Sequence, residues 1–242
     1  EQIFGVSYLG SGGLSLMRVV RGLNAAKTVV ISDRESAISR VPDAVLKKLT
    51  DALGNDMSAE KAVELILNKV RNEGDKALKE LTFKLDGIQE DSFEVPKSAL
   101  VDAYSKVDSE LVRALEVAVE RCTRFHQSSL PQGWTDSSEG YGEILLPLGT
   151  VGAYIPRGLV STVLMTGIPS KVAGVEQVVI CTPPSVNGLP EPALLVAADL
   201  VEVDRVFAIG GAQAIAAMAY GTESIPKVDI VCGPGNVFVT LA

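Results

Sequence analysis

Apolar residues in the first part of the chain recur three and four positions apart, from about residue 40 to residue 125. This spacing places them on one face of an α-helix. It predicts helices at 42–53, from 58 to a break at Gly74, at 75–81, from about 98, and at 108–125. The candidate N-caps carry short polar side chains that can accept from the first free N–H groups; they are Ser58, Asp75, Ser98 and Asp108. The polar stretch 128–142 predicts a connecting loop or hairpin.

The pattern changes after residue 143, where short apolar runs alternate with helical stretches. Strands are predicted at 151–155, 177–181, 205–209 and 227–231, with helices at 163–173, 192–200 and 212–220. The strand ends at Ile155, Ile180, Ile209 and Ile230 are 25, 29 and 21 positions apart. Strands separated by single helices predict an α/β fold, a parallel sheet with right-handed crossovers and helices on both faces.

Glycine and proline follow three of the four predicted strands, at 156–158, 210–211 and 233–235. In open parallel sheets, ligands bind beyond the carboxyl ends of the strands. Glycine lets a ligand approach the backbone, and the following helix N-terminus offers free N–H groups to an anion. The pattern therefore predicts a ligand-binding edge at these turns.

Composition excludes several classes of function. The chain has 30 acidic and 22 basic residues and a net charge of −8, which argues against a nucleic-acid partner. Its apolar runs are too short to predict a membrane span, and its N-terminus lacks the pattern of a signal peptide. Three scattered cysteines and one histidine predict free thiols in a reducing compartment, with no metal site of local ligand spacing.

Common motifs do not narrow the function further. The chain contains no G-x-G-x-x-G after its first strand, no G-x-x-x-x-G-K-[ST] and no G-x-S-x-G. From the residues alone, the interpretation ends at an α/β domain with a glycine-lined ligand edge.

Longer runs at the strand ends resemble histidinol dehydrogenases. The most specific are IGGAQAIAA at 209–217, YGTESIPKVD at 220–229 and GPGNVFVT at 233–240. Shorter similar runs are Tyr154–Pro156, Ser161–Met165, Lys171–Val175, Thr182–Pro184, Gly74–Leu78 and Phe125–His126. The resemblance covers about residues 40–242.

The resemblance implies a Rossmann-like, aldehyde-dehydrogenase-like fold and a cytoplasmic, homodimeric enzyme that oxidises L-histidinol to L-histidine with two NAD and a zinc ion. It assigns cofactor contacts to Tyr154, Gln213 and Asn236. It places the zinc ligands and the acid/base residues in sequence beyond this chain, so no catalytic or metal-binding residue is expected here, and the chain alone is expected to lack turnover. Simpler roles stay open: a core tyrosine at 154 and helix caps at 213 and 236.

Three regions follow from this reading: an appendage or linker at 1–16, a mainly helical part of an incomplete first lobe at 17–144, and a Rossmann-like NAD-binding lobe at 145–242. One segment departs from the family pattern, because the loop at 156–161 is a few residues shorter and Arg157 replaces a glycine. Two alternatives remain: a non-catalytic nucleotide-binding or assembly module derived from the family, and a wider relative acting on another amino alcohol.

Overall fold

The computed structural model describes residues 4–8, 15–19, 22–24, 26–28, 58–89, 92–185 and 187–242. The chain divides into two compact units, residues 1–46 and 47–242. In the first unit, β1 (Phe4–Tyr8) pairs antiparallel with β2 (Ser15–Val19). The helix predicted at 42–53 lies outside the described residues, and the domain boundaries predicted at 16/17 and 144/145 stay predictions.

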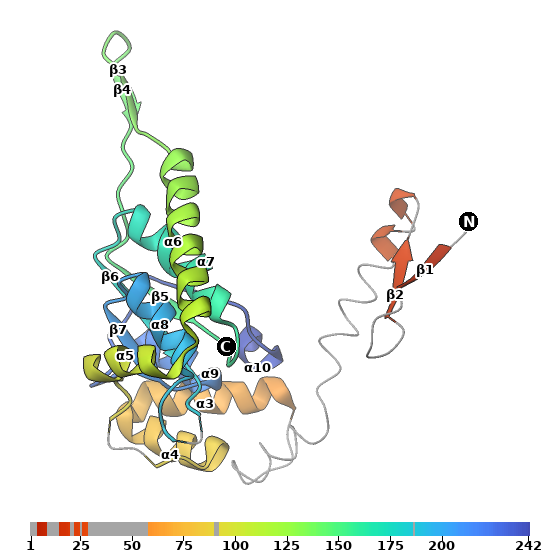
Figure 1. Cartoon of the computed structure of the whole chain (residues 1–242), viewed down its shortest axis with the longest axis vertical. Coiled ribbons are helices and arrows are strands. Elements are labelled where there is room, and N and C mark those ends of the chain that lie inside the picture. Colours follow the sequence, from red (N-terminus) through yellow and green to blue (C-terminus); the bar gives the residue numbers. More distant parts are fainter. Residues whose placement is uncertain are drawn as a thin grey trace. The chain divides into compact units, whose positions relative to one another are not determined.

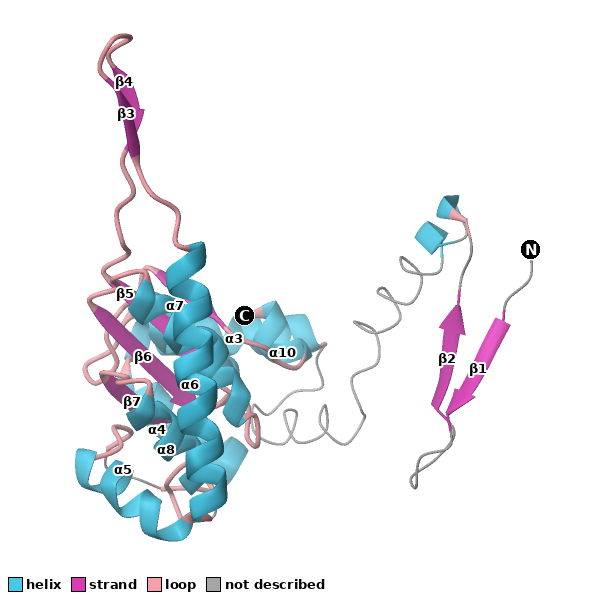
Figure 2. Cartoon of the chain, turned by 45° about the horizontal axis from the view of Figure 1, so that its top comes forward, coloured by secondary structure: helices cyan, strands magenta, loops and turns pink. Residues whose placement is uncertain are grey.

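A four-stranded parallel sheet forms the centre of the second unit (Figure 2). Its strands are β5 (Thr150–Tyr154), β6 (Gln177–Thr182), β7 (Arg205–Ala208) and β8 (Ile230–Cys232). They lie in the order β7-β6-β5-β8, so the chain first adds strands on one side of β5 and then crosses to its other side. The reversal creates a topological switch point between β5 and β8, where ligands of such sheets bind.

Helices cover both faces of the sheet, as predicted (Figure 1). On one side, α7 (Val160–Val172) and α8 (Pro192–Leu200) pack with α5 (Lys97–Ala103), a 3₁₀ turn (Tyr104–Lys106) and α6 (Ser109–Ser129). On the other, α9 (Gly211–Tyr220) packs with α3 (Ala59–Glu73), α4 (Asp75–Asp86) and α10 (Val237–Leu241). The apolar surfaces of the sheet are thereby buried in a three-layer α/β arrangement.

Successive side chains of each strand point to opposite faces of the sheet, and so to different helix layers. Ile180 on β6 lies in one apolar cluster with Val163 of α7 and Leu194 of α8. Gly152 on β5 faces α9, where a Cβ atom would lie 2.8 Å from the Met218 sulfur and 3.0 Å from a Val228 methyl carbon. A glycine is therefore needed at this point for α9 to pack closely on the sheet.

Two of the four predicted caps are confirmed. The Ser58 hydroxyl accepts from the Lys61 N–H at 3.4 Å, and the Asp108 carboxylate accepts from the Glu110 N–H at 2.7 Å. Ser98 is not a cap, because α5 begins one residue earlier, after Pro96, and proline presets the backbone angle of the entry to a helix. Asp75 is not a cap either, because it is the first residue of α4.

A distant residue performs the role expected of Asp75. The Glu223 carboxylate accepts from the Asp75 N–H at 2.8 Å, and the Ser224 hydroxyl donates to the Asp75 side chain. The Asp229 carboxylate accepts from the Thr150 N–H at 2.8 Å, at the amino end of β5. β8 begins at Ile230 and not at residue 227, where the sequence pattern predicted it, because the Val228 N–H donates to the Met218 carbonyl oxygen of α9 and not to the sheet. Much of the YGTESIPKVD run therefore ties the helices to the sheet.

The stretch predicted as a loop or hairpin is a hairpin. Its strands β3 (Trp134–Asp136) and β4 (Tyr141–Glu143) pair antiparallel, and the Trp134 and Tyr141 rings meet edge to face with centroids 5.7 Å apart. Together with the segments on either side, it projects beyond the end of α6 (Figure 1). The arms expose several large apolar side chains: Leu130, Trp134, Tyr141, Ile144, Leu145, Leu146 and Leu148.

Candidate functional site

The loops at the carboxyl edge of the sheet lie against one another. Gly233, with φ of +131°, approaches β5 so closely that a Cβ atom there would overlap the Tyr154 carbonyl oxygen. A Cβ atom on Gly210 would lie 2.6 Å from the Pro183 ring. The Arg157 guanidinium donates to the Pro184 carbonyl oxygen, which connects the turns after β5 and β6. The glycine- and proline-containing turns thus meet at one edge, as their spacing predicted.

Tyr154 ends β5 with its ring buried, at 5% exposure, on the α9 side of the sheet. Its hydroxyl oxygen accepts from the Gly211 N–H at 3.2 Å, at the first residue of α9. Burial raises the pKa of the Tyr154 phenol, and the Gly211 N–H opposes this rise. The hydroxyl therefore remains protonated at neutral pH and keeps a proton that it can donate.

Gln213 lies in the first turn of α9 with 1% of its surface exposed. Its side chain folds back beside Gly211, where a Cβ atom would be 2.6 Å from the Gln213 Oε1 atom. This oxygen is buried and accepts no hydrogen bond. A buried acceptor without a donor typically costs about 1–3 kcal/mol, so a ligand donor at this position would remove a penalty that the ligand-free chain carries.

Asn236 caps α10. Its Oδ1 atom accepts from the N–H groups of Phe238 at 3.1 Å and Val239 at 3.2 Å, and the residue is exposed. It lies three residues after Gly233, at the end of β8, the strand next to β5. The structure thus brings Tyr154 and Gln213 together at Gly211 and places Asn236 on the adjacent strand end. The capping role does not decide between a structural and a cofactor-binding assignment, because the amide NH₂ group still has two donors.

Comparisons with known proteins identify the family. The family model described as histidinol dehydrogenase matches residues 49–242. This chain belongs to the histidinol dehydrogenase family. A histidinol dehydrogenase of Deinococcus radiodurans is 42% identical over 231 residues, which are 93% of this chain and 52% of that protein. One of Methanococcus maripaludis is 47% identical over 188 residues, 74% of this chain and 44% of the relative.

A solved structure agrees with this assignment. The crystal structure of histidinol dehydrogenase from Elizabethkingia anophelis superimposes with a TM-score of 0.72 at 35% identity, covering 76% of this chain and 44% of that one. The predicted family and the α/β fold class are both confirmed. The chain spans about half the length of the curated relatives it matches.

Two of the three cysteines of this family member, Cys181 and Cys232, are poor nucleophile candidates. Cys181, in β6, is completely buried, and burial raises the pKa of its thiol. Burial also raises the pKa of the Cys232 thiol, at the end of β8. Because the thiolate is the reactive form, neither residue is activated for attack at neutral pH.

The part of the chain that the structure describes contains no group of three or more His, Cys, Asp or Glu residues placed to hold a metal ion. Within the same residues, no helix is both long and apolar enough to cross a membrane.

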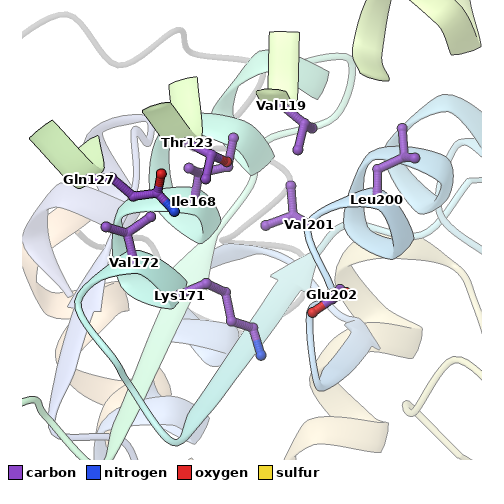
Figure 3. A pocket seen from close by; sticks show the side chains of 9 residues that line it. All are labelled: Val119, Thr123, Gln127, Ile168, Lys171, Val172, Leu200, Val201 and Glu202. Carbon is purple, nitrogen blue, oxygen red and sulfur yellow. The ribbon is translucent and has the colours of Figure 1, made fainter. Parts of the chain in front are cut away.

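A cavity of about 340 Å³ lies between α6, α7 and α8 (Figure 3). Its walls include Thr123 and Gln127 of α6, Lys171 of α7 and Glu202 after α8. Because α7 and α8 start at the carboxyl edge of the sheet, their C-terminal ends, which line this cavity, lie at the amino edge. The cavity is therefore at the opposite end of the sheet from Tyr154 and Gln213.

Two residues of the carboxyl edge were not singled out from sequence. Thr182 ends β6, is 1% exposed, and its hydroxyl oxygen has no hydrogen-bond partner. Asp86, at the end of α4, lies near enough to contribute to the raised pKa of Tyr154. The position of Thr182 at a strand end was a usable signal, whereas the approach of Asp86 depends on how α4 packs.

Proposed function

We propose that this chain forms the NAD-binding lobe of an enzyme that oxidises L-histidinol to L-histidine with two NAD. The main observation behind the proposal is the unpartnered Gln213 oxygen next to Gly211, whose N–H donates to the Tyr154 hydroxyl, at the carboxyl edge of a parallel sheet. This edge includes the switch point between β5 and β8, where dinucleotides bind in sheets of this kind. Family membership supports the reaction, and the placement of these groups supports the cofactor.

The residues present fit NAD. The cofactor carries ribose hydroxyls and a carboxamide, whose hydrogen atoms could satisfy the buried Gln213 acceptor. Tyr154 offers an aromatic ring and a protonated hydroxyl, and Asn236 offers amide donors at the neighbouring strand end. When bound, NAD supplies the hydride acceptor, while these side chains bind and orient it.

We assign the zinc ion and the acid/base residues to the part of the relatives that this chain does not match. Removing a hydroxyl proton as hydride leaves needs a base, and a metal ion can hold the oxygen. The 242-residue chain is expected to give no NADH from L-histidinol, with or without added zinc. Absorbance at the NADH band measures this, with the full-length Deinococcus radiodurans relative as positive control. A zinc-dependent rate from the chain alone would show that it contains catalytic groups.

We also propose that the protein acts as a cytoplasmic homodimer in which a second copy covers the hairpin arms. Ile144 and Leu146 are 84% and 82% exposed and lie among the other exposed apolar side chains of the arms, and a group of such side chains marks an interaction surface. The free cysteines Cys122, Cys181 and Cys232 agree with a reducing compartment.

Sedimentation velocity tests the second copy. The chain is expected to sediment as a dimer, and the double variant Ile144→Glu, Leu146→Glu as a monomer, because two buried carboxylates would oppose association. Val101→Glu on α5, at a site 67% exposed, is the matched control and should leave the dimer intact. A monomeric wild-type chain at all concentrations, or a double variant that dimerises as well as wild type, would contradict the proposal.

A further inference from the structure

The turn after β5 carries a positive charge at the candidate cofactor edge. Arg157 lies in this turn, is exposed, and donates to the Pro184 carbonyl oxygen near the start of the connection that follows β6. That contact places the guanidinium between the β5–α7 and β6–α8 turns. It uses one of five N–H donors, so the planar group keeps donors for an anion.

A second, independent observation comes from the strand that precedes Pro184. Thr182 is the last residue of β6, directly before Pro183 and Pro184, and its buried hydroxyl has no partner. Because side chains alternate along a strand, Thr182 shares the face of Ile180, which packs against α7 and α8. The hydroxyl is therefore on the side of the sheet where α7 begins after the Arg157 turn.

The N-terminus of α7 is a third feature that favours an anion at this edge. Its N-cap residue is Leu159, which has no side-chain oxygen to accept from the first-turn N–H groups. A helix N-terminus carries partial positive charge and favours anions. The Arg157 guanidinium and the start of α7 therefore make the α7 side of the edge favourable for an anion.

We propose that Arg157, with the Thr182 hydroxyl and the start of α7, binds the diphosphate of the dinucleotide. The inference rests on the proposed function and deepens it, because it orients the cofactor across the edge. The diphosphate lies on the α7 side, and the uncharged ribose and carboxamide groups reach Gln213 on the α9 side. Arg157 is a cofactor-binding residue in this assignment, and its charge takes the place of a glycine-rich phosphate loop.

The test compares Arg157→Gln and Arg157→Lys with the wild-type chain by calorimetric titration of NAD. Arg157→Gln is expected to weaken binding at least about ten-fold, the usual effect of losing a hydrogen bond to a charged group, and Arg157→Lys less. Raising the salt concentration should weaken wild-type binding but hardly change that of Arg157→Gln. Arg121→Gln is the charge-matched control and should bind as wild type, because Arg121 is an exposed residue of α6 between Val119 and Thr123, which line the cavity at the amino edge. Melting temperatures without ligand show that each variant is folded.

The outcomes separate this inference from the proposed function. If wild type binds NAD and Arg157→Gln binds it equally well, the diphosphate assignment is wrong and the cofactor lobe stands. If wild type does not bind NAD, the proposed function fails. Inorganic diphosphate, followed by phosphorus NMR line broadening, then decides the anion site by itself. Broadening by wild type that is lost in Arg157→Gln supports the site, and equal broadening or none overturns it.

Discussion

Replacing Gly233 by alanine is expected to destabilise the second unit by about 3 kcal/mol and to abolish NAD binding, because strain and a steric clash combine at this position. The backbone angle φ of Gly233 is +131°, a value that residues with a Cβ atom rarely adopt. The added Cβ atom would also lie 3.0 Å from the Tyr154 carbonyl carbon and 3.1 Å from the Tyr154 backbone nitrogen. The end of β8 would have to move away from β5, and the candidate cofactor edge would open.

Urea denaturation of the Gly233→Ala chain measures the first effect, and NAD calorimetry the second. Gly140→Ala is the matched control: Gly140 has φ of +78° in the β3–β4 turn, and a Cβ atom there would meet nothing within 4 Å. The control should show the smaller cost of backbone strain and leave NAD binding unchanged. Equal unfolding free energies for the two variants would show that the close approach of Gly233 to Tyr154 does not contribute to stability.

Replacing Gln213 by leucine is expected to have opposite effects on stability and on function. Without ligand, the variant should be more stable by about 1–2 kcal/mol, because a buried acceptor without a partner is removed. NAD affinity should fall at least about ten-fold, because the donor on the cofactor would lose its acceptor. Stabilisation combined with lost binding distinguishes a ligand-binding amide from one that only fills space.

Thr82→Val provides the control for Gln213→Leu. The Thr82 hydroxyl, in α4, is also buried without a partner, at 2% residue exposure. Removing it should raise stability without changing NAD affinity, if the effect on binding belongs to the cofactor edge. If Gln213→Leu destabilises the ligand-free chain, or binds NAD as well as wild type, the amide serves the fold and not the cofactor.

Local patterns were sufficient to predict most of the sheet. The helix predicted at 192–200 matches α8, because proline at its first position and an unbroken apolar run mark both ends. The predicted parallel arrangement is confirmed for β5, β6, β7 and β8. The β8 boundary was wrong because it depends on a tertiary contact, the hydrogen bond from the Val228 N–H to the Met218 carbonyl oxygen of α9. The cap of α4 could not be found either, since Glu223 is 148 positions from Asp75.

The candidate site was predictable in position but not in detail. Glycine-containing turns after parallel strands place a ligand edge from pattern alone, and the family resemblance points to Tyr154, Gln213 and Asn236 on that edge. Neither source indicates that the Gln213 oxygen is buried without a donor, because this depends on how α9 packs against β5. The cofactor assignments of the three residues remain predictions.

Calorimetric titration of NAD into the wild-type 242-residue chain tests the central claim most directly. Saturable binding of one NAD per chain, competed by ADP-ribose, is the result expected if Tyr154, Gln213 and Asn236 lie around a dinucleotide. A folded chain that gives no heat at millimolar NAD would contradict the claim.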